Sequence, residues 1–358
     1  MSDVIDADGH LVEGMSFMAE ALARFGEHMR LEPDEESGVA LYIEGRRYPQ
    51  SSGPGRGVST QHSTCHERGI DPSTVAGVLA DAGREGIGTM VLYPSLALGV
   101  PGFRDLTFAR GFADHYNHFA ASWCAESKGR LRAVAVVPLE DVDASVEMLT
   151  TARDLGLVGV CVPPALRERN LDHPDLERFW AAAADLELPI GVHGAPGLHL
   201  PKLGVERFTN YVQVHCVSFP FDQMTAMTSL VSGGVLERHP RLRVAFLEAG
   251  IGWLPFFLDR LDEHYAKRGD WIADGWKRPP REYLARGQIY ATCEPDESLL
   301  PAACAILGAE HVMYASDYPH WDSEFPESAR PIRERADLGD AARASVLGGS
   351  ARAFYGLG

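Results

Sequence analysis

Residues of metal-binding types are concentrated in three short segments of the chain. Asp8 and His10 lie two positions apart, His193 follows a Gly-Val pair, and Asp317 lies in a Ser-Asp-Tyr-Pro sequence. Because residues i and i+2 of an extended segment point the same way, Asp8 and His10 can present a carboxylate oxygen and an imidazole nitrogen to one ion. Each residue also has an ordinary alternative, since the aspartates could cap local backbone and His193 could be a hydrogen-bonded core histidine. A metal centre requires a fold that brings all four together.

Eight short apolar runs supply the elements that could do this. They are rich in Val, Ile and Leu, as is typical of parallel strands buried on both faces, and they cover residues 4–7, 89–93, 132–137, 158–162, 189–192, 243–247, 289–292 and 312–315. Helical patterns, such as the one over 139–155, lie between them. The alternation predicts parallel βαβ units and an α/β fold, the (β/α)8 TIM barrel, with a doubly wound open sheet as the alternative.

The ligand-type residues occupy equivalent places along these strands. Asp8 and His10 leave the first strand, His193 the fifth, Glu248 the sixth and Asp317 the eighth. A barrel gathers the carboxyl ends of its strands at one mouth, so residues that are distant in sequence can share an ion there. The chain is therefore predicted to be a metalloenzyme.

Two connections are too long to be simple crossovers. We expect one domain over 1–358, with insertions after the first and fifth strands at about 11–72 and 194–242. Residues 51–57 are rich in Ser, Gly and Pro, which favours irregular backbone, whereas 221–231 reads as a helix. Insertions after barrel strands lie over the active-site mouth, so both are candidate lids or substrate walls.

The composition limits the partners. The chain has 50 acidic and 33 basic residues and a net charge of −17, which argues against nucleic acid or an anionic membrane and favours a small-molecule substrate. It has no secretory leader pattern and no apolar run of about 20 residues, so we expect a cytoplasmic protein without a membrane span. The six cysteines form no CxxC pair, which suggests reduced thiols.

Residues 253–258 form a dense apolar stretch. Such a stretch is typical of an interface between copies of the chain, and equally of a barrel helix that packs onto its sheet. We expect a homo-oligomer.

Several motifs resemble a known family. The Asp-x-His pair, His193 and Ser-Asp-Tyr-Pro, together with residues 239–244, 252–255 and 354–357, are similar to the amidohydrolase superfamily. They are most similar to its amidohydrolase-2 branch, which includes aminocarboxymuconate semialdehyde decarboxylase and the resorcylate decarboxylases. The resemblance implies a TIM barrel with Asp8, His10, His193 and Asp317 as ligands of one divalent ion, zinc or manganese. It also implies metal-assisted hydrolysis or nonoxidative decarboxylation.

The chain departs from these decarboxylases after the sixth strand. They place a histidine there as acid and base, whereas this chain has Glu248 in a Leu-Glu-Ala-Gly sequence. A carboxylate cannot donate a proton at neutral pH unless its pKa is raised by several units. In decarboxylation, His215 or His320 would then have to be the proton donor; in hydrolysis, Asp317 or Glu248 would accept the proton of the attacking water.

Additional ligand types suggest a second hypothesis. With Glu13, Glu248, His320 and His215 added, the chain offers more ligands than one zinc ion needs, and mixed oxygen and nitrogen ligands suit two iron ions or a manganese and an iron ion. A dinuclear oxygenase (hydroxylase) on the same scaffold is therefore the alternative function. In the competing interpretation, Glu248 orients a ligand histidine, His320 donates a hydrogen bond to substrate and His215 lies on a helix surface.

Overall fold

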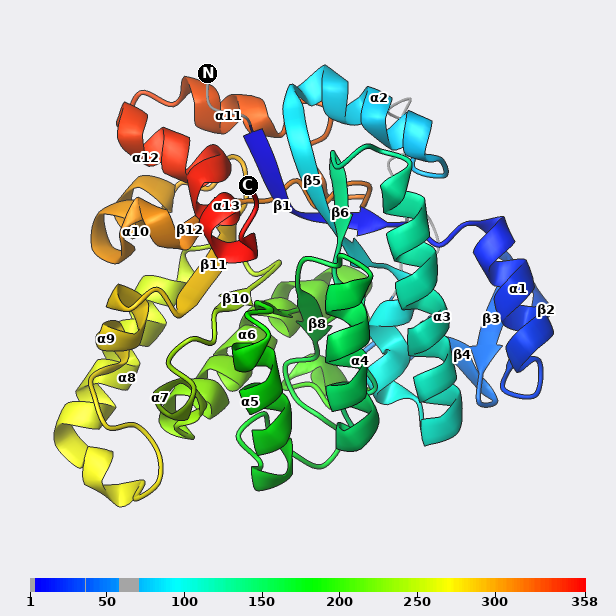
Figure 1. Ribbon diagram of the computed structural model, residues 1–358, viewed down its shortest axis with the longest axis horizontal. Helices are drawn as coiled ribbons and strands as arrows, with labels where there is room; N and C mark the ends of the chain where they lie inside the picture. The colour runs from blue at the N-terminus through cyan, green and yellow to red at the C-terminus, as the bar shows by residue number, and fades with distance from the viewer. Residues whose placement is uncertain (1–3, 36, 58–70) are drawn as a thin grey trace.

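The barrel is built from parallel strands in sequence order. The computed structural model describes residues 4–35, 37–57 and 71–358. Its barrel strands, seen near the centre of Figure 1, are β1 (Val4–Leu11), β5 (Ile87–Pro94), β6 (Leu131–Ala133) continued by β7 (Ala135–Val136), β8 (Val160–Val162), β9 (Ile190–Val192), β10 (Val244–Phe246), β11 (Ile289–Cys293) and β12 (Val312–Tyr314). They pair as β1-β5-β6 and β7-β8-β9-β10-β11-β12.

Hydrogen bonds join these two sheets at both edges. Between β6 and β7, the amide of Val134 donates to the Leu92 carbonyl, while the amide of Ala135 donates to the Gly159 carbonyl. At the other edge, the amide of Asp317 donates to the Asp8 carbonyl at 3.1 Å. The strands thus follow one another around a closed ring. The predicted TIM barrel is confirmed, and the doubly wound alternative is wrong.

Helices surround this ring (Figure 1). The α-helices that follow the barrel strands are α2 (Val75–Glu85), α3 (Leu106–Ala125), α4 (Val142–Asp154), α5 (Glu177–Asp185), α6 (Tyr211–Ser232), α7 (Val235–Arg238), α8 (Trp253–Arg268), α9 (Pro280–Ala285), α10 (Leu300–Leu307), α11 (Ala329–Glu334), α12 (Asp340–Ala344) and α13 (Ser350–Tyr355). Short helical turns are η2 (Leu96–Gly102), η3 (Pro174–Leu176), η4 (Val205–Arg207), η5 (Gly269–Trp271), η6 (Ala309–His311) and η7 (Ser345–Gly349). The helix expected over 139–155 is α4, which begins after an Asp141 side-chain cap on the Ala144 amide.

The insertion after β1 carries regular structure that the sequence analysis did not predict. It contains α1 (Met15–Phe25) and an antiparallel sheet of β2 (Met29–Asp34), β3 (Gly38–Ile43) and β4 (Arg46–Tyr48), at the right-hand side of Figure 1. Glu44 and Gly45 both have positive φ, as the tight turn between β3 and β4 requires. Residues 51–57 lack regular structure, as predicted, and 58–70 lie outside the described residues.

The insertion after β9 is dominated by α6. The Asn210 side chain caps this helix at the Val212 amide, so the helix begins ten residues before the predicted stretch at 221–231. Among the helices that the structure describes, none has the length and hydrophobicity needed to span a bilayer. The five described cysteines are free, in agreement with reduced thiols.

The apolar stretch at 253–258 lies on α8. Trp253, Leu254 and Leu258 are buried in the core, whereas Phe256 is 60% exposed. Packing of α8 against the barrel therefore explains why most residues of this stretch are apolar. The expected homo-oligomer stays a prediction.

The last helix is tied to the first strand. The hydroxyl of Tyr355 on α13 donates to the Ala7 carbonyl at 2.7 Å, and the hydroxyl of Tyr93 on β5 donates to that of Tyr355 at 2.9 Å. All three residues are buried. The backbone just before Asp8 is thus held by side chains from two other elements.

Candidate metal centre

The four residues chosen from the sequence meet at the carboxyl ends of the strands. Asp8 and His10 lie on β1, and His193 and Asp317 follow β9 and β12. Potential ligand atoms of Asp8, His10 and His193 lie within 4.8 Å of one another, and so do those of His10, Asp317 and His320. All except His320 are buried. The fold therefore places side chains that are up to 309 positions apart, from Asp8 to Asp317, around one small volume.

His10 is oriented by a backbone carbonyl. Its Nδ1 lies 3.0 Å from the Pro94 carbonyl oxygen, which can only accept, so Nδ1 carries the proton and Nε2 keeps a free lone pair. This Nε2 lies 3.3 Å from Asp317 Oδ1 and 4.0 Å from Asp8 Oδ1. A ring fixed through one nitrogen with the other facing carboxylates is the usual arrangement of a metal-binding histidine.

Several buried polar atoms in this volume have no hydrogen-bond partner. They are Asp8 Oδ1, His10 Nε2, Glu248 Oε2 and both ring nitrogens of His193. His193 Nε2 and Glu248 Oε2 are only 3.0 Å apart without forming an aligned hydrogen bond. Buried polar groups without partners are costly, and oxygen and nitrogen ligands without thiolate suit a divalent ion such as manganese or zinc. The residues present therefore fit such an ion.

Burial and mutual repulsion shift the pKa values of these groups. Burial raises the pKa of Glu248 well above its usual range, and the nearby charges of Asp317 and Asp8 raise it further. Burial, followed by repulsion from Asp317, likewise raises the pKa of Asp8. Burial lowers the pKa of His193 well below its usual range, with a further contribution from His10. Burial thus disfavours the charged forms of Glu248, Asp8 and His193. A bound cation would instead favour the charged forms of the two carboxylates.

Asp317 and His320 form a hydrogen-bonded pair of side chains. Nδ1 of His320 donates to Asp317 Oδ1 at 2.7 Å, and the His320 ring lies over that of His10 with centroids 4.1 Å apart. Burial opposes ionisation of both groups, but their mutual attraction lowers the pKa of Asp317 far below its usual range and raises the pKa of His320. Nε2 is then the nitrogen of His320 that is not used by Asp317.

The backbone is strained at two of these positions. Glu248 and Asp317 have φ values of 55° and 52°, in the left-handed region that non-glycine residues seldom occupy. Such conformations persist where the surrounding structure enforces them, and they are concentrated at functional sites. Glu248 lies two residues after the end of β10, and Asp317 lies three residues after the end of β12.

Of the four additional predicted ligands, only His320 belongs to one of the two groups of converging atoms; Glu248 lies beside His193, and Glu13 and His215 lie farther out. Both carboxylate oxygens of Glu13 accept backbone amides, from Leu96 at 2.8 Å and from Ala97 at 3.0 Å. His215, on α6, has its Nε2 3.5 Å from Asp322 Oδ2 and packs beside aromatic rings. Both residues still line the pocket described below, so their role as ligands or catalytic groups stays a prediction.

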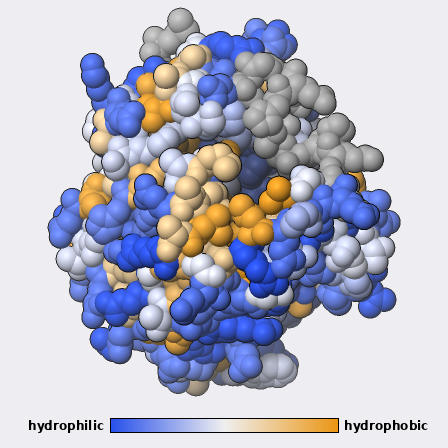
Figure 2. Space-filling view, turned by 90° about the vertical axis from the view of Figure 1, so that its right-hand side faces the viewer, coloured by the Kyte–Doolittle hydropathy of each residue, from blue (hydrophilic) through white to orange (hydrophobic). Residues whose placement is uncertain are grey.

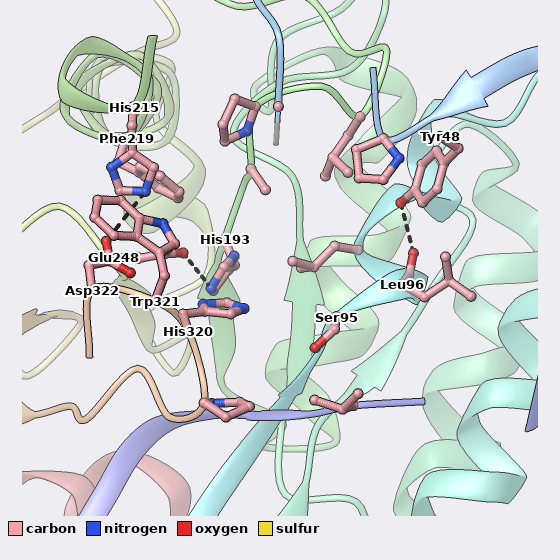
Figure 3. Close-up of a pocket in the computed structure, with 18 of the residues that line it drawn as sticks. Tyr48, Ser95, Leu96, His193, His215, Phe219, Glu248, His320, Trp321 and Asp322 are labelled. Carbon is pink, nitrogen blue, oxygen red and sulfur yellow. Dashed lines mark hydrogen bonds and ion pairs between the residues drawn. The ribbon is translucent and has the colours of Figure 1, made fainter. Parts of the chain in front are cut away.

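A pocket of about 390 Å³ opens above the converging side chains. In Figure 3, His193, Glu248 and His320 point toward one another, with Trp321 and His215 to the left of His193 and Tyr48 and Leu96 on the opposite side. Both insertions contribute to its walls, as predicted: Met18 and Tyr48 come from the first, and Leu198 and Phe219 from the second. Figure 2 views the molecule from the side of the first insertion, where the surface is hollowed beside a band of hydrophobic residues.

Some residues of this region were not singled out from the sequence. The Tyr93 ring stacks on His193 with centroids 5.5 Å apart, and Trp321 Nε1 donates to the Tyr211 hydroxyl at 3.2 Å. Burial raises the pKa of Asp322 to about 6, with repulsion from Asp317 adding to it. Trp321 and Asp322 directly follow the Ser-Asp-Tyr-Pro-His sequence, which was a usable signal. Tyr93 and Tyr211 carry no sequence signal of their own.

A closed barrel with converging acidic and imidazole groups at its mouth is the architecture of a metal-dependent enzyme. Residues 86–357 match the amidohydrolase family, and the chain belongs to it. A 2-amino-3-carboxymuconate-6-semialdehyde decarboxylase of Dictyostelium discoideum is 26% identical over 70% of this chain and 67% of its own length. A gamma-resorcylate decarboxylase of Rhizobium sp. is 29% identical over 65% of this chain and 73% of its own.

Solved structures agree on the fold. An amidohydrolase of Mycobacterium avium subsp. paratuberculosis matches all of this chain and 98% of its own with a TM-score of 0.78 and 18% identity. A dihydroxybenzoic acid decarboxylase of Polaromonas, solved with manganese and 2-nitroresorcinol, matches 100% of this chain and 98% of its own with a TM-score of 0.69 and 20% identity. None of these comparisons supports the oxygenase alternative with two iron ions, or manganese and iron.

Proposed function

We propose that the protein is a metal-dependent nonoxidative decarboxylase of a small aromatic or conjugated carboxylic acid. The observation that carries the proposal is the set of unpartnered buried ligand atoms that faces a largely apolar pocket. Decarboxylases among the relatives add support, since two of them are named for resorcylate and for a carboxymuconate semialdehyde.

Asp8, His10, His193 and Asp317 would hold one divalent ion, manganese or zinc. When bound, the ion would attract the substrate carboxylate and an adjacent hydroxyl and stabilise the negative charge that develops as carbon dioxide leaves. Glu248 would complete the acidic side of the site beside His193. The charge of these carboxylates is what the ion must balance.

The pocket walls would orient the ring and exclude water. Tyr48, Leu98 and Phe219 present apolar surface, which favours a planar hydrophobic substrate over a polar one. Water exclusion strengthens the attraction between the buried charged groups and the substrate.

His320 is our candidate for the proton donor. The carbon that loses carbon dioxide retains the electron pair and must take up a proton. His320 lines the pocket, Asp317 fixes its Nδ1, and the same contact raises its pKa, so the protonated ring can donate from Nε2. It would thereby replace the histidine that the decarboxylases carry after the sixth strand.

Metal-assisted hydrolysis is the second candidate. Glu248 occupies the place after β10, and a carboxylate 3.0 Å from His193 could accept the proton of a water molecule. This chemistry would release no carbon dioxide.

One assay separates the two candidates. Protein stripped of metal and then reloaded with manganese or zinc should release carbon dioxide from 2,6-dihydroxybenzoate or related hydroxylated aromatic acids. In D2O, the product should carry deuterium at the carbon that bore the carboxylate. The stripped protein is the control. Cleavage of amides or esters by the reloaded protein, without carbon dioxide from any acid, would overturn the proposal in favour of hydrolysis.

A further inference from the structure

Gln223 of α6 links the ends of two barrel strands. Its side chain is fully buried, and its Nε2 donates to the Val192 carbonyl at 3.0 Å and to the Leu247 carbonyl at 2.8 Å. Val192 directly precedes His193, and Leu247 directly precedes Glu248. Because both partners are carbonyl oxygens, only an amide nitrogen with its two hydrogens can bond both at once.

The backbone pairing between β9 and β10 ends at this point. The last residues paired between β9 and β10 are Val192 and Phe246, and beyond them the Leu247 amide reaches the Val192 carbonyl at 3.3 Å. The Glu248 amide turns away to the Thr292 hydroxyl at 3.2 Å. The Gln223 amide thus continues the connection between the two strands where the backbone no longer provides it.

The residue next to Gln223 supports the other side of His193. Asp222 forms a buried ion pair with Lys202, and both side chains are only 5% exposed. A Cβ on Gly194 would lie 3.1 Å from Asp222 Oδ2 and 3.2 Å from Lys202 Nζ, so this ion pair packs directly on the backbone after His193. Two consecutive residues of α6 therefore hold the chain immediately before and after His193.

His193 depends on this support more than His10 does. His10 is fixed through Nδ1 by the Pro94 carbonyl, whereas neither ring nitrogen of His193 has a hydrogen-bond partner. The position of the His193 ring therefore depends on its backbone and on ring contacts with Tyr93 and His10. The same backbone connection fixes the distance from His193 Nε2 to Glu248 Oε2, which is 3.0 Å.

We infer that Gln223 is a positioning residue for the metal centre: through the two carbonyls, it sets the spacing of His193 and Glu248 and so the affinity for the ion. The inference rests on the proposed metal site. Gln223 itself touches neither the ion nor the substrate in this scheme, and it acts through the backbone of the two residues that do. Groups that orient metal ligands typically contribute about 10-fold to 100-fold to affinity.

The chain offers a matched control in Gln288. This glutamine is also buried, and its Nε2 donates to the Leu236 carbonyl at 2.9 Å and to the His239 carbonyl at 3.1 Å. It precedes β11, at the amino end of the barrel strands and away from the mouth. Gln288→Met thus removes the same kind of double hydrogen bond without disturbing the site.

The test compares Gln223→Met with Gln288→Met in the full chain. Both should lower the thermal midpoint, but only Gln223→Met should weaken Mn2+ binding, by at least about 10-fold, as measured by the electron paramagnetic resonance signal of free Mn2+. Gln223→Glu is the second variant, used if the methionine protein does not fold. Buried against two carbonyls, this glutamic acid stays protonated and supplies one donor, so its affinity should fall between those of the wild type and the methionine variant.

Three results would overturn the inference. They are unchanged Mn2+ affinity in both Gln223 variants, an equal loss in Gln288→Met, and a Gln223→Glu protein that binds more weakly than Gln223→Met. Failure of the proposed metal site is recognised separately, because the wild-type protein would then bind no Mn2+ at all. Failure of the proposed decarboxylation would appear in the carbon dioxide assay and would leave the Mn2+ comparison intact.

Discussion

In the proposed reaction, a single residue would supply the proton. His320 and His215 both line the pocket, but their surroundings differ. Asp317 holds His320 and raises its pKa, whereas burial lowers the pKa of His215 on α6. A histidine with a lowered pKa is mostly neutral at pH 7 and is a poor acid there.

Replacement of each histidine should therefore have a different effect. We expect His320→Asn to lower kcat by about 100-fold to 10,000-fold, as removal of a general acid does, while one Mn2+ still binds per chain. His215→Asn should lower kcat much less, because its ring forms part of the pocket wall. The measurement is steady-state decarboxylation with metal content determined on the same samples. A larger loss of kcat in His215→Asn than in His320→Asn would show that His215, on α6, is the proton donor.

At the level of residues, the sequence predicted which side chains the fold would bring together but not what surrounds them. Asp8, His10, His193 and Asp317 were predicted because their types and their places after strands coincide, and they lie together. Glu13 was chosen on the same grounds, but its carboxylate accepts two amides of η2. Those amides belong to a turn 83 and 84 residues away, and no local pattern reveals such a contact.

The strand ends are held by close packing inside the barrel. Gly191 on β9 lies against the Tyr93 side chain, and a Cβ at this position would come within 2.0 Å of the tyrosine hydroxyl. Tyr93 stacks on His193 and bonds Tyr355, so it cannot move freely. The glycine therefore provides the room that the tyrosine needs beside the candidate metal centre.

We expect Gly191→Ala to destabilise the protein by about 1–3 kcal/mol through overpacking. Gly83→Ala is the control: Gly83 lies inside α2 with nothing within 4 Å of an added Cβ, so alanine should stabilise the helix by about 1 kcal/mol. Urea unfolding of both variants measures the difference. Equal changes in the two proteins would show that the tyrosine contact has no effect on stability.

At the level of elements, the barrel could be predicted and the inserted sheet could not. The barrel strands are continuous apolar runs between helices, a pattern with few structural solutions. The strands β2 and β3 alternate buried and exposed residues imperfectly, as in the exposed Leu31 and Val39, so their pattern resembles a polar loop. Only the pairing of β2 with β3 and of β3 with β4 makes them a sheet.

The buried acidic groups of the whole molecule affect its stability. Burial raises the pKa of Glu13 to about 7 and that of Glu294, which follows β11, to about 8; the pKa of His320 is also raised. For each group, the folded protein binds more protons than the unfolded chain, so stability falls as pH rises through the folded pKa. His10 and His193 have lowered pKa values and act in the opposite direction, but only below about their ordinary value of 6.5.

The thermal midpoint of the metal-free protein should therefore decrease from pH 7 to pH 9. With Mn2+ bound, the decrease should be smaller, because the ion stabilises the ionised carboxylates of Asp8 and Glu248. Thermal unfolding with chelator or with Mn2+, at each pH, measures the gap between the two midpoints, which should widen as pH rises. A gap that narrows would contradict the raised pKa values of these carboxyl groups.

The hydrogen bond from Tyr355 to the Ala7 carbonyl joins positions 348 apart in the chain. During synthesis, Asp8 leaves the ribosome first, yet neither the tyrosine that braces its backbone nor Asp317 exists until the final part of the barrel has been translated. The proposed ligand set is therefore complete only after Asp317 has been translated, and we expect the full site to bind its ion once the barrel has closed.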